Sequence, residues 1–137
     1  MQFITDNFIP ARAHVKENKE AFERFGAEWT PTILIVDGIA KEHHRIEGFL
    51  PADDFLAQLK LGLAHAARSR GEFADAEKRY RELSAGENDV AAESLYWAGV
   101  SKYKATNDAS ALGDTAKAFG ERFTDSAWAK KASVWKS

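Results

Sequence analysis

The stretch Phe25-Gly-Ala-Glu-Trp-Thr-Pro-Thr-Ile-Leu-Ile-Val-Asp-Gly38 decides how the first half of this chain folds. Gly26 follows the helical pattern of residues 17–25, and glycine is the usual residue just past the end of a helix. Thr32–Val36 is then a continuous β-branched and apolar run, which is typical of a strand covered on both faces. Because Asp37-Gly38 is a strong turn signal, the stretch predicts a helix end, a Thr-Pro corner and a buried strand that enters a hairpin.

The segments on either side of this stretch extend it into a sheet. Upstream, Phe8–Val15 alternates loosely between apolar and polar residues and has its proline early, where a strand tolerates it. Glu17–Phe25 has helical spacing of its apolar residues and predicts one amphipathic helix. Downstream, the more polar Lys41–Gly48 predicts a second strand, which pairs with Thr32–Val36 as an antiparallel hairpin and lies at the edge of the sheet.

A helix is predicted to begin at Pro51, since proline is favoured in the first turn. Asp53 and Asp54 fall in that first turn, where carboxylates complement the helix dipole, and this explains them better than an acid–base pair does. With no helix breaker before Gly71, the helix is predicted to continue to Arg68. Its expected inner stripe consists of Phe55, Leu56, Leu59 and Leu63.

This order of elements resembles the later part of a thioredoxin-like domain, over about residues 3–65. In that family the proline before the hairpin has a cis peptide bond and stands opposite a Cys-x-x-Cys sequence, and the residue before it offers backbone groups to a substrate chain. The resemblance therefore implies a peptide-binding corner formed by Trp29, Thr30 and Pro31, with Trp29 partly exposed. The chain has no cysteine, so it cannot perform dithiol–disulfide chemistry, and we expect no catalytic residue and no cofactor.

The unit that holds Cys-x-x-Cys in the family would lie upstream of Phe3. Two interpretations stay open: a non-catalytic protein that binds polypeptide or self-associates, or the remainder of a longer thiol-disulfide oxidoreductase whose Cys-x-x-Cys lies upstream. In the family the strand of that missing unit runs between those that match Phe8–Val15 and Thr32–Val36. Unpaired strand edges recruit other strands, and we therefore expect a homodimer or a polypeptide partner.

The second half is predicted to be helical throughout. The expected helices are 71–83, 90–105 and 109–123, with another that begins near Thr124 and ends near Trp135. Their pattern resembles a pair of tetratricopeptide-type helical hairpins with a period of about 35 residues. The resemblance implies either a partner-binding unit or a helical cap. The predicted fold is thus α/β (α+β): an incomplete thioredoxin-like sheet in residues 1–65, then tetratricopeptide-like hairpins in residues 66–137.

The charge and the apolar runs of the chain argue against several classes of function. The chain has 137 residues, with 19 basic and 21 acidic side chains well mixed, which argues against binding to nucleic acid or a membrane surface. No apolar run approaches the length of a membrane span, and the first residues lack the pattern of a secretion signal, so we expect a cytoplasmic protein.

The histidines and tryptophans are expected to serve the structure. His43 and His44 are neighbours in a strand and must point to opposite faces. His14 and His65 are isolated in sequence, so no metal site is expected. Trp97, Trp128 and Trp135 are expected to pack in the core, although Trp135 could also cover a partner surface.

Overall fold

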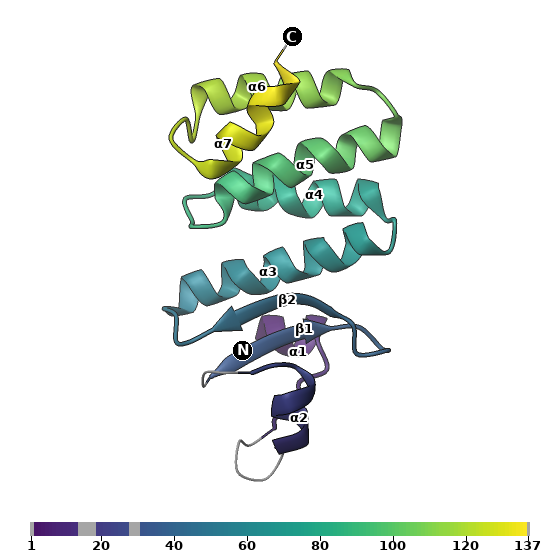
Figure 1. Cartoon of the computed structure of the whole chain (residues 1–137), viewed down its shortest axis with the longest axis vertical. Helices are drawn as coiled ribbons and strands as arrows, with labels where there is room; N and C mark the ends of the chain where they lie inside the picture. Colours follow the sequence, from purple (N-terminus) through teal and green to yellow (C-terminus); the bar gives the residue numbers. More distant parts are fainter. Residues whose placement is uncertain (1, 14–18, 28–30, 137) are drawn as a thin grey trace.

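The computed structural model describes residues 2–13, 19–27 and 31–136. Within these residues the chain forms a two-stranded sheet and seven α-helices, stacked one above another along the long axis of the molecule (Figure 1). The elements are α1 (Gln2–Asn7), α2 (Lys19–Arg24), β1 (Thr32–Val36), β2 (Glu42–Glu47), α3 (Ala52–Ser69), α4 (Phe73–Ser84), α5 (Ala91–Thr106), α6 (Ser110–Glu121), α7 (Ala127–Ala132) and a terminal 3-10 turn (Ser133–Trp135). The mixed α/β fold expected from the sequence is confirmed.

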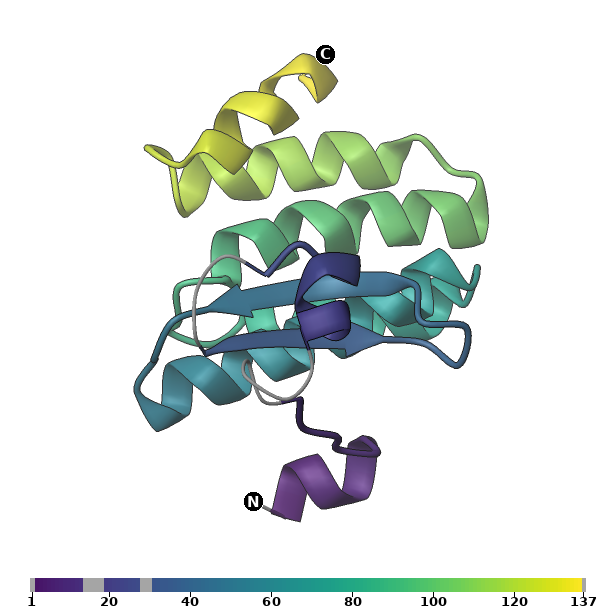
Figure 2. The ribbon, with the colours of Figure 1, turned by 60° about the horizontal axis from the view of Figure 1, so that its bottom comes forward.

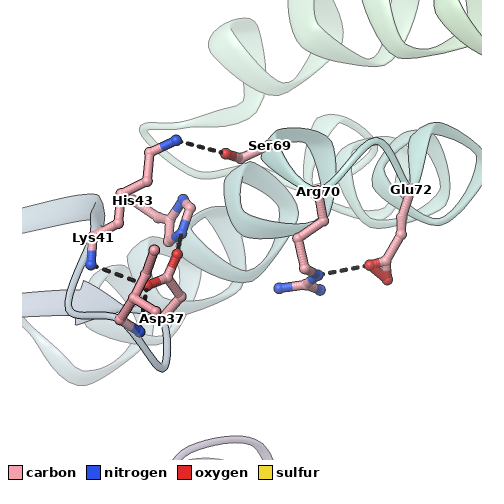
Figure 3. A network of polar contacts seen from close by, with 7 residues as sticks. Asp37, Lys41, His43, Ser69, Arg70 and Glu72 are labelled. Carbon is pink, nitrogen blue, oxygen red and sulfur yellow. Dashed lines mark hydrogen bonds and ion pairs between the residues drawn. The ribbon is translucent and has the colours of Figure 1, made fainter.

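The predicted hairpin is present, and Asp37 holds its turn. β1 and β2 are antiparallel, with Ile33 opposite Ile46. One carboxylate oxygen of Asp37 accepts hydrogen bonds from the backbone N–H groups of Ile39 and Lys41, both at 3.0 Å, and the other lies 2.9 Å from Nε2 of His43 (Figure 3). The hydrogen bond with His43, followed by those from the backbone, lowers the pKa of Asp37.

A second contact joins the hairpin to the end of α3. Figure 3 shows the Lys41 ammonium reaching Ser69 Oγ, at 3.3 Å, and Arg70 bonded to Glu72 at 2.7 Å in the turn that follows. All four side chains are exposed, and ion pairs and hydrogen bonds between exposed groups add little stability. The contact between Lys41 and Ser69 links the hairpin to α3, and the ion pair between Arg70 and Glu72 lies in the turn between α3 and α4. Both are better explained as structural contacts than as a binding site.

Arg45 of β2 attaches α2 to the sheet. Its guanidinium donates hydrogen bonds to the carbonyls of Phe25 and Gly26, just past the last residue of α2, and forms an ion pair of 2.7 Å with Glu42. A cation is favourable at the carboxyl end of a helix. In Figure 2, α2 lies in front of the strands and α3 behind them, so the two helices lie on opposite sides of the hairpin.

The strand predicted at Phe8–Val15 is wrong over Phe8–Ala13, which form no regular structure; the last two residues lie outside the described part of the chain. The short helix α1 precedes this segment. Phe3, Ile4 and Phe8 pack against the cluster formed by Ile35, Ile46 and Leu59. A strand persists only when a neighbour pairs with it; here Phe8 packs on the core beside α1, whereas Ile9 is exposed.

α3 begins after Pro51 as predicted, but its buried surface is wider than the predicted stripe. Of that stripe only Leu59 is fully buried, while Leu61, Ala64 and Ala67 are completely inaccessible. α3 packs against the sheet on one side and α4 on the other (Figure 1). A helix between two layers needs small residues on both faces, and Gly62 is one of them: a Cβ there would lie 2.0 Å from Cδ1 of Ile35.

The helices after α3 follow the predicted order, and their ends differ from the predicted ones by one to three residues. Leu95, Ala98 and Gly99 of α5 and Phe119 of α6 are buried and face the interior of the helical stack. Continuous packing of α3 against α4 and of α4 against α5 joins the sheet to the helical stack. The boundary that we predict after residue 65 falls inside α3 and stays a prediction. None of the described helices combines the length and apolar character needed to cross a membrane.

Candidate functional site

Of the predicted peptide-binding corner, Trp29 and Thr30 lie outside the described residues, whereas Pro31 is described and half-buried. The Pro31 carbonyl accepts a hydrogen bond of 2.7 Å from the N–H of Gly48, at the end of β2. Phe49 follows directly and is 91% exposed. This exposed apolar ring lies at the same end of the hairpin as Pro31.

The hydrogen bond between Gly48 and Pro31 also fixes which backbone groups of β1 face outward. In an antiparallel pair, hydrogen-bonded and non-hydrogen-bonded residues alternate. Since Pro31 bonds to Gly48, the next bonded pairs are Ile33 with Ile46 and Ile35 with His44. The N–H and C=O of Leu34 therefore point away from β2. Among the described residues β2 is the only strand paired with β1, so β1 presents an edge there.

A second group of polar side chains is brought together by the fold and was not expected from the sequence. His44 of β2 and His65 of α3 have ring centres 5.6 Å apart, although they are isolated in sequence. His65 Nδ1 lies 2.6 Å from the hydroxyl of Tyr80, and its Nε2 lies 3.3 Å from a carboxylate oxygen of Glu93. We call His44, His65, Tyr80 and Glu93 the polar junction, because it joins β2, α3, α4 and α5.

Two residues of α3 and one of α5 complete the surroundings of this junction. Gln58 Oε1 lies 2.6 Å from Nε2 of His44. Arg68 Nε donates a hydrogen bond of 3.1 Å to the Tyr80 hydroxyl, and the Arg68 guanidinium lies 3.9 Å from the ring centre of Trp97. Every polar side chain of the junction therefore has a partner, as buried polar groups require.

The order of hydrogen atoms in the junction follows from these contacts. Tyr80 accepts from Arg68, so its own hydroxyl hydrogen can donate to Nδ1 of His65. When the His65 ring is neutral, its Nε2 then holds the ring hydrogen and donates it to Glu93. Burial raises the pKa of Tyr80 to about 12, with the bond from Arg68 opposing the rise. A neutral, completely buried phenol cannot meet a substrate, so Tyr80 serves the structure.

Burial lowers the pKa of His44, because a buried imidazolium loses its hydration. The hydrogen bond with Gln58 acts in the opposite direction and raises the pKa of His44. The charge of His65 lowers it further. The nearby carboxylates of Glu93 and Glu42 raise it slightly. Burial alone would raise the pKa of Glu93. The hydrogen bond with His65, and the charges of His65 and His44, outweigh burial, and the pKa of Glu93 is lowered.

We expect the protein to lose stability as the pH falls below the ordinary histidine pKa of about 6.5. In this range His44 takes up a proton more readily in the unfolded chain, since folding lowers its pKa, and stability then decreases with decreasing pH. Glu93 adds a loss of the same sign below its ordinary value of 4.5. The measurement is urea unfolding between about pH 7.5 and pH 5.5, in the wild type and in His44→Asn.

The asparagine variant keeps a polar side chain and removes the titration of residue 44. The wild type should lose more stability than His44→Asn over the same interval, because the remaining histidines are shared by both proteins. Equal losses in the two proteins would contradict the role of His44.

The remaining expected site residues are placed as follows. His43 and His44 point to opposite faces, one bonded to Asp37 and the other to Gln58. His14 lies outside the described residues. Within the described part of the chain, no three histidine or carboxylate side chains are arranged to hold a metal ion. Asp53 and Asp54 lie in the first turn of α3, as expected.

The C-terminal tryptophans pack around Tyr96. Trp97 and Trp128 contact its ring edge-on or tilted, and Trp135 stacks on it with ring centres 4.8 Å apart. All three are half-buried, so their expected role in core packing is confirmed. Trp135 covers Tyr96 of its own chain.

The corner, the hairpin and the first part of α3 all lie within one match to known families. Residues 2–62 match the family model of a thioredoxin-like domain. Over these residues the chain is similar to a thioredoxin-like domain. The match ends within α3, before the helical stack. No curated protein and no solved structure matched the chain.

Proposed function

We propose that this chain is a non-catalytic thioredoxin-like protein that binds an extended polypeptide along the outer edge of β1. The observation that supports the proposal most directly is the orientation of Leu34, whose backbone N–H and C=O point away from β2. β1 contains no charged residue, and charged residues are what natural edge strands use to prevent strand addition. The absence of cysteine removes dithiol chemistry from this part of the chain.

The proposed binding surface continues to the corner at Trp29, Thr30 and Pro31. Backbone hydrogen bonds along an edge give affinity without sequence preference, and neighbouring apolar surfaces supply the preference. The exposed ring of Phe49, next to the residue that bonds to Pro31, can supply such a surface. The expected ligand is therefore an extended segment with apolar side chains near the end that meets this corner.

A second copy of the chain is one such ligand, because β1 is itself an extended apolar segment. We include a homodimer in the proposal on this ground. The helices of residues 66–137 stack as hairpins, and we interpret them as a tetratricopeptide-like extension. In this proposal they form a helical cap on α3, since α4 covers the face of α3 that the sheet leaves free.

The alternative is that the chain is the remainder of a longer thiol-disulfide oxidoreductase whose Cys-x-x-Cys lies upstream. It is favoured by the match of residues 2–62 to a thioredoxin-like domain. In that case an upstream strand would occupy the edge of β1 in the same chain. An insulin-reduction assay on a longer protein that contains this chain distinguishes the two hypotheses. Reduction of insulin supports the oxidoreductase, and no reduction supports the binding protein.

Leu34→Pro is expected to abolish strand addition and to leave the hairpin intact. Proline lacks the N–H group, and that of Leu34 faces outward, so no bond between β1 and β2 is lost. Each backbone hydrogen bond contributes about 1 kcal/mol, and a partner strand would lose one or two of them together with close approach. We expect self-association, measured by sedimentation velocity up to high micromolar concentration, to weaken about tenfold or more.

Leu34→Ala is the matched control, because it also removes the leucine side chain but keeps the N–H. It should associate far more strongly than Leu34→Pro, and circular dichroism should show that both variants are folded. If the wild type is a monomer at all concentrations, the homodimer is wrong. If, in addition, Leu34→Pro binds extended apolar peptides as well as Leu34→Ala does, strand addition at β1 is wrong too.

A further inference from the structure

A groove of about 440 Å³ lies between the first half of α3 and the second half of α4, away from the outer edge of β1. Its apolar lining comes from Leu56 and Ala57 of α3 and Leu83 of α4. Phe3 of α1 lines it as well. Ala57 and Leu83 are buried, and they belong to the core that fixes the two helices, so these helices form a rigid part of the wall.

Four carboxylates surround the apolar lining at one end of this groove. Asp53 and Asp54 stand on the first turn of α3, and Glu82 and Glu87 stand on the last turn of α4 and the loop after it. Because α3 and α4 form an antiparallel hairpin (Figure 1), these two segments are neighbours. None of the four carboxylates has a hydrogen bond or an ion pair with another described residue through its side chain.

The two basic residues of the groove lie toward its other end and have their own contacts. The Lys60 ammonium lies 5.7 Å from the ring centre of Phe3. Arg79 forms an ion pair of 3.0 Å with Asp75 of the same helix. Neither contact involves the four carboxylates, so the acidic end of the groove is left without a compensating cation among the described residues.

We propose that this groove binds a cationic amphipathic polypeptide segment. Its Lys or Arg side chains would meet Asp53, Asp54, Glu82 and Glu87, and an apolar side chain between them would lie on Leu56 and Leu83. A charge pattern of this kind selects the partner and speeds its association. The proposal concerns a surface other than the β1 edge and does not depend on strand addition there.

The test uses the full chain and a fluorescently labelled peptide of alternating Lys and Leu, with binding followed by anisotropy. The groove variant is D53N/D54N/E82Q/E87Q. The control variant E23Q/D114N/E121Q/D125N makes the same change in net charge outside the groove, at residues whose side chains have no ion pair with a described residue. We expect about tenfold weaker binding to the groove variant and less than about twofold weaker binding to the control.

If the groove variant and the control variant lost the same amount of peptide binding, the peptide would be attracted only by the net charge of the protein, and the proposal would be overturned. Equal binding of a peptide in which Glu replaces every Lys would also overturn it. A loss of binding in Leu34→Pro would place the peptide on the β1 edge instead. Because neutralising the first turn of α3 could unfold the groove variant, E82Q/E87Q is measured as well. The two residues of this variant lie outside the first turn of α3. The variant should bind the peptide at least about threefold more weakly than the matched control E121Q/D125N does.

Discussion

Tyr80→Ala is expected to lower the free energy of unfolding by about 3–5 kcal/mol, the usual cost of deleting a large buried aromatic ring. Tyr80 has no exposed surface and is the largest completely buried side chain among the described residues. Its removal would leave a cavity between α3 and α4. It would also leave His65 Nδ1 and Arg68 Nε without the hydroxyl that now bonds to both. Urea unfolding at neutral pH measures the loss.

Tyr80→Phe separates the cavity from the hydrogen bonds. Phenylalanine fills the same space and removes only the hydroxyl, so we expect a smaller loss of about 1–3 kcal/mol, the cost of unsatisfied buried partners. If Tyr80→Phe were as destabilising as Tyr80→Ala, the hydrogen bonds of the polar junction would outweigh packing. If neither variant were destabilised, the burial of Tyr80 between α3 and α4 would be wrong.

Gly99→Ala is expected to destabilise the protein by about 1–3 kcal/mol, the usual cost of overpacking. A Cβ on Gly99 of α5 would lie 2.0 Å from Oγ1 and 2.8 Å from Cβ of Thr115 on α6. Thr115 is buried, and its hydroxyl donates a hydrogen bond of 2.7 Å to the carbonyl of Ala111. The methyl group can therefore be accommodated only if the two helices move apart. Thermal and urea unfolding measure the effect.

Gly113→Ala makes the same change in the same pair of helices, at a position where a Cβ meets nothing within 4 Å. There the substitution should stabilise the helix by about 0.5–1 kcal/mol, because alanine loses less backbone entropy than glycine. The double variant Gly99→Ala/Thr115→Ala should recover part of the stability, since it removes the nearest clashing atom. A Gly99→Ala protein as stable as Gly113→Ala would refute the close approach of α5 and α6.

Much of the architecture was predictable because its signals are local. The β-branched run Thr32–Val36 before Asp37-Gly38 predicts the hairpin from backbone preference alone. The helix after Pro51 is predicted from its first turn, and the helices of the second half from the 3.6-residue period of their apolar side chains. The strand prediction failed over Phe8–Ala13 because alternation describes a strand only when a neighbouring strand is present, and none of the described residues supplies one.

The corner at residues 29–31, the polar junction and the groove were less predictable than the fold. The corner at Trp29, Thr30 and Pro31 came from a resemblance, and of it the structure describes only Pro31. The polar junction could not be expected, because His44, His65, Tyr80 and Glu93 are spread over four elements and no spacing along the chain relates them. The groove has the same origin, since its carboxylates come from the opposite ends of two helices.

The sequence by itself determined the order of the elements from α2 onward, the turn at Asp37 and the absence of dithiol chemistry, because each depends on residue type and on neighbours a few positions away. Only the tertiary structure decided that α3 is buried on two faces, that α2 is attached through Arg45, and that His44 and His65 lie side by side. These features depend on distances between segments far apart in the chain. Such distances follow from packing the whole set of apolar surfaces at once.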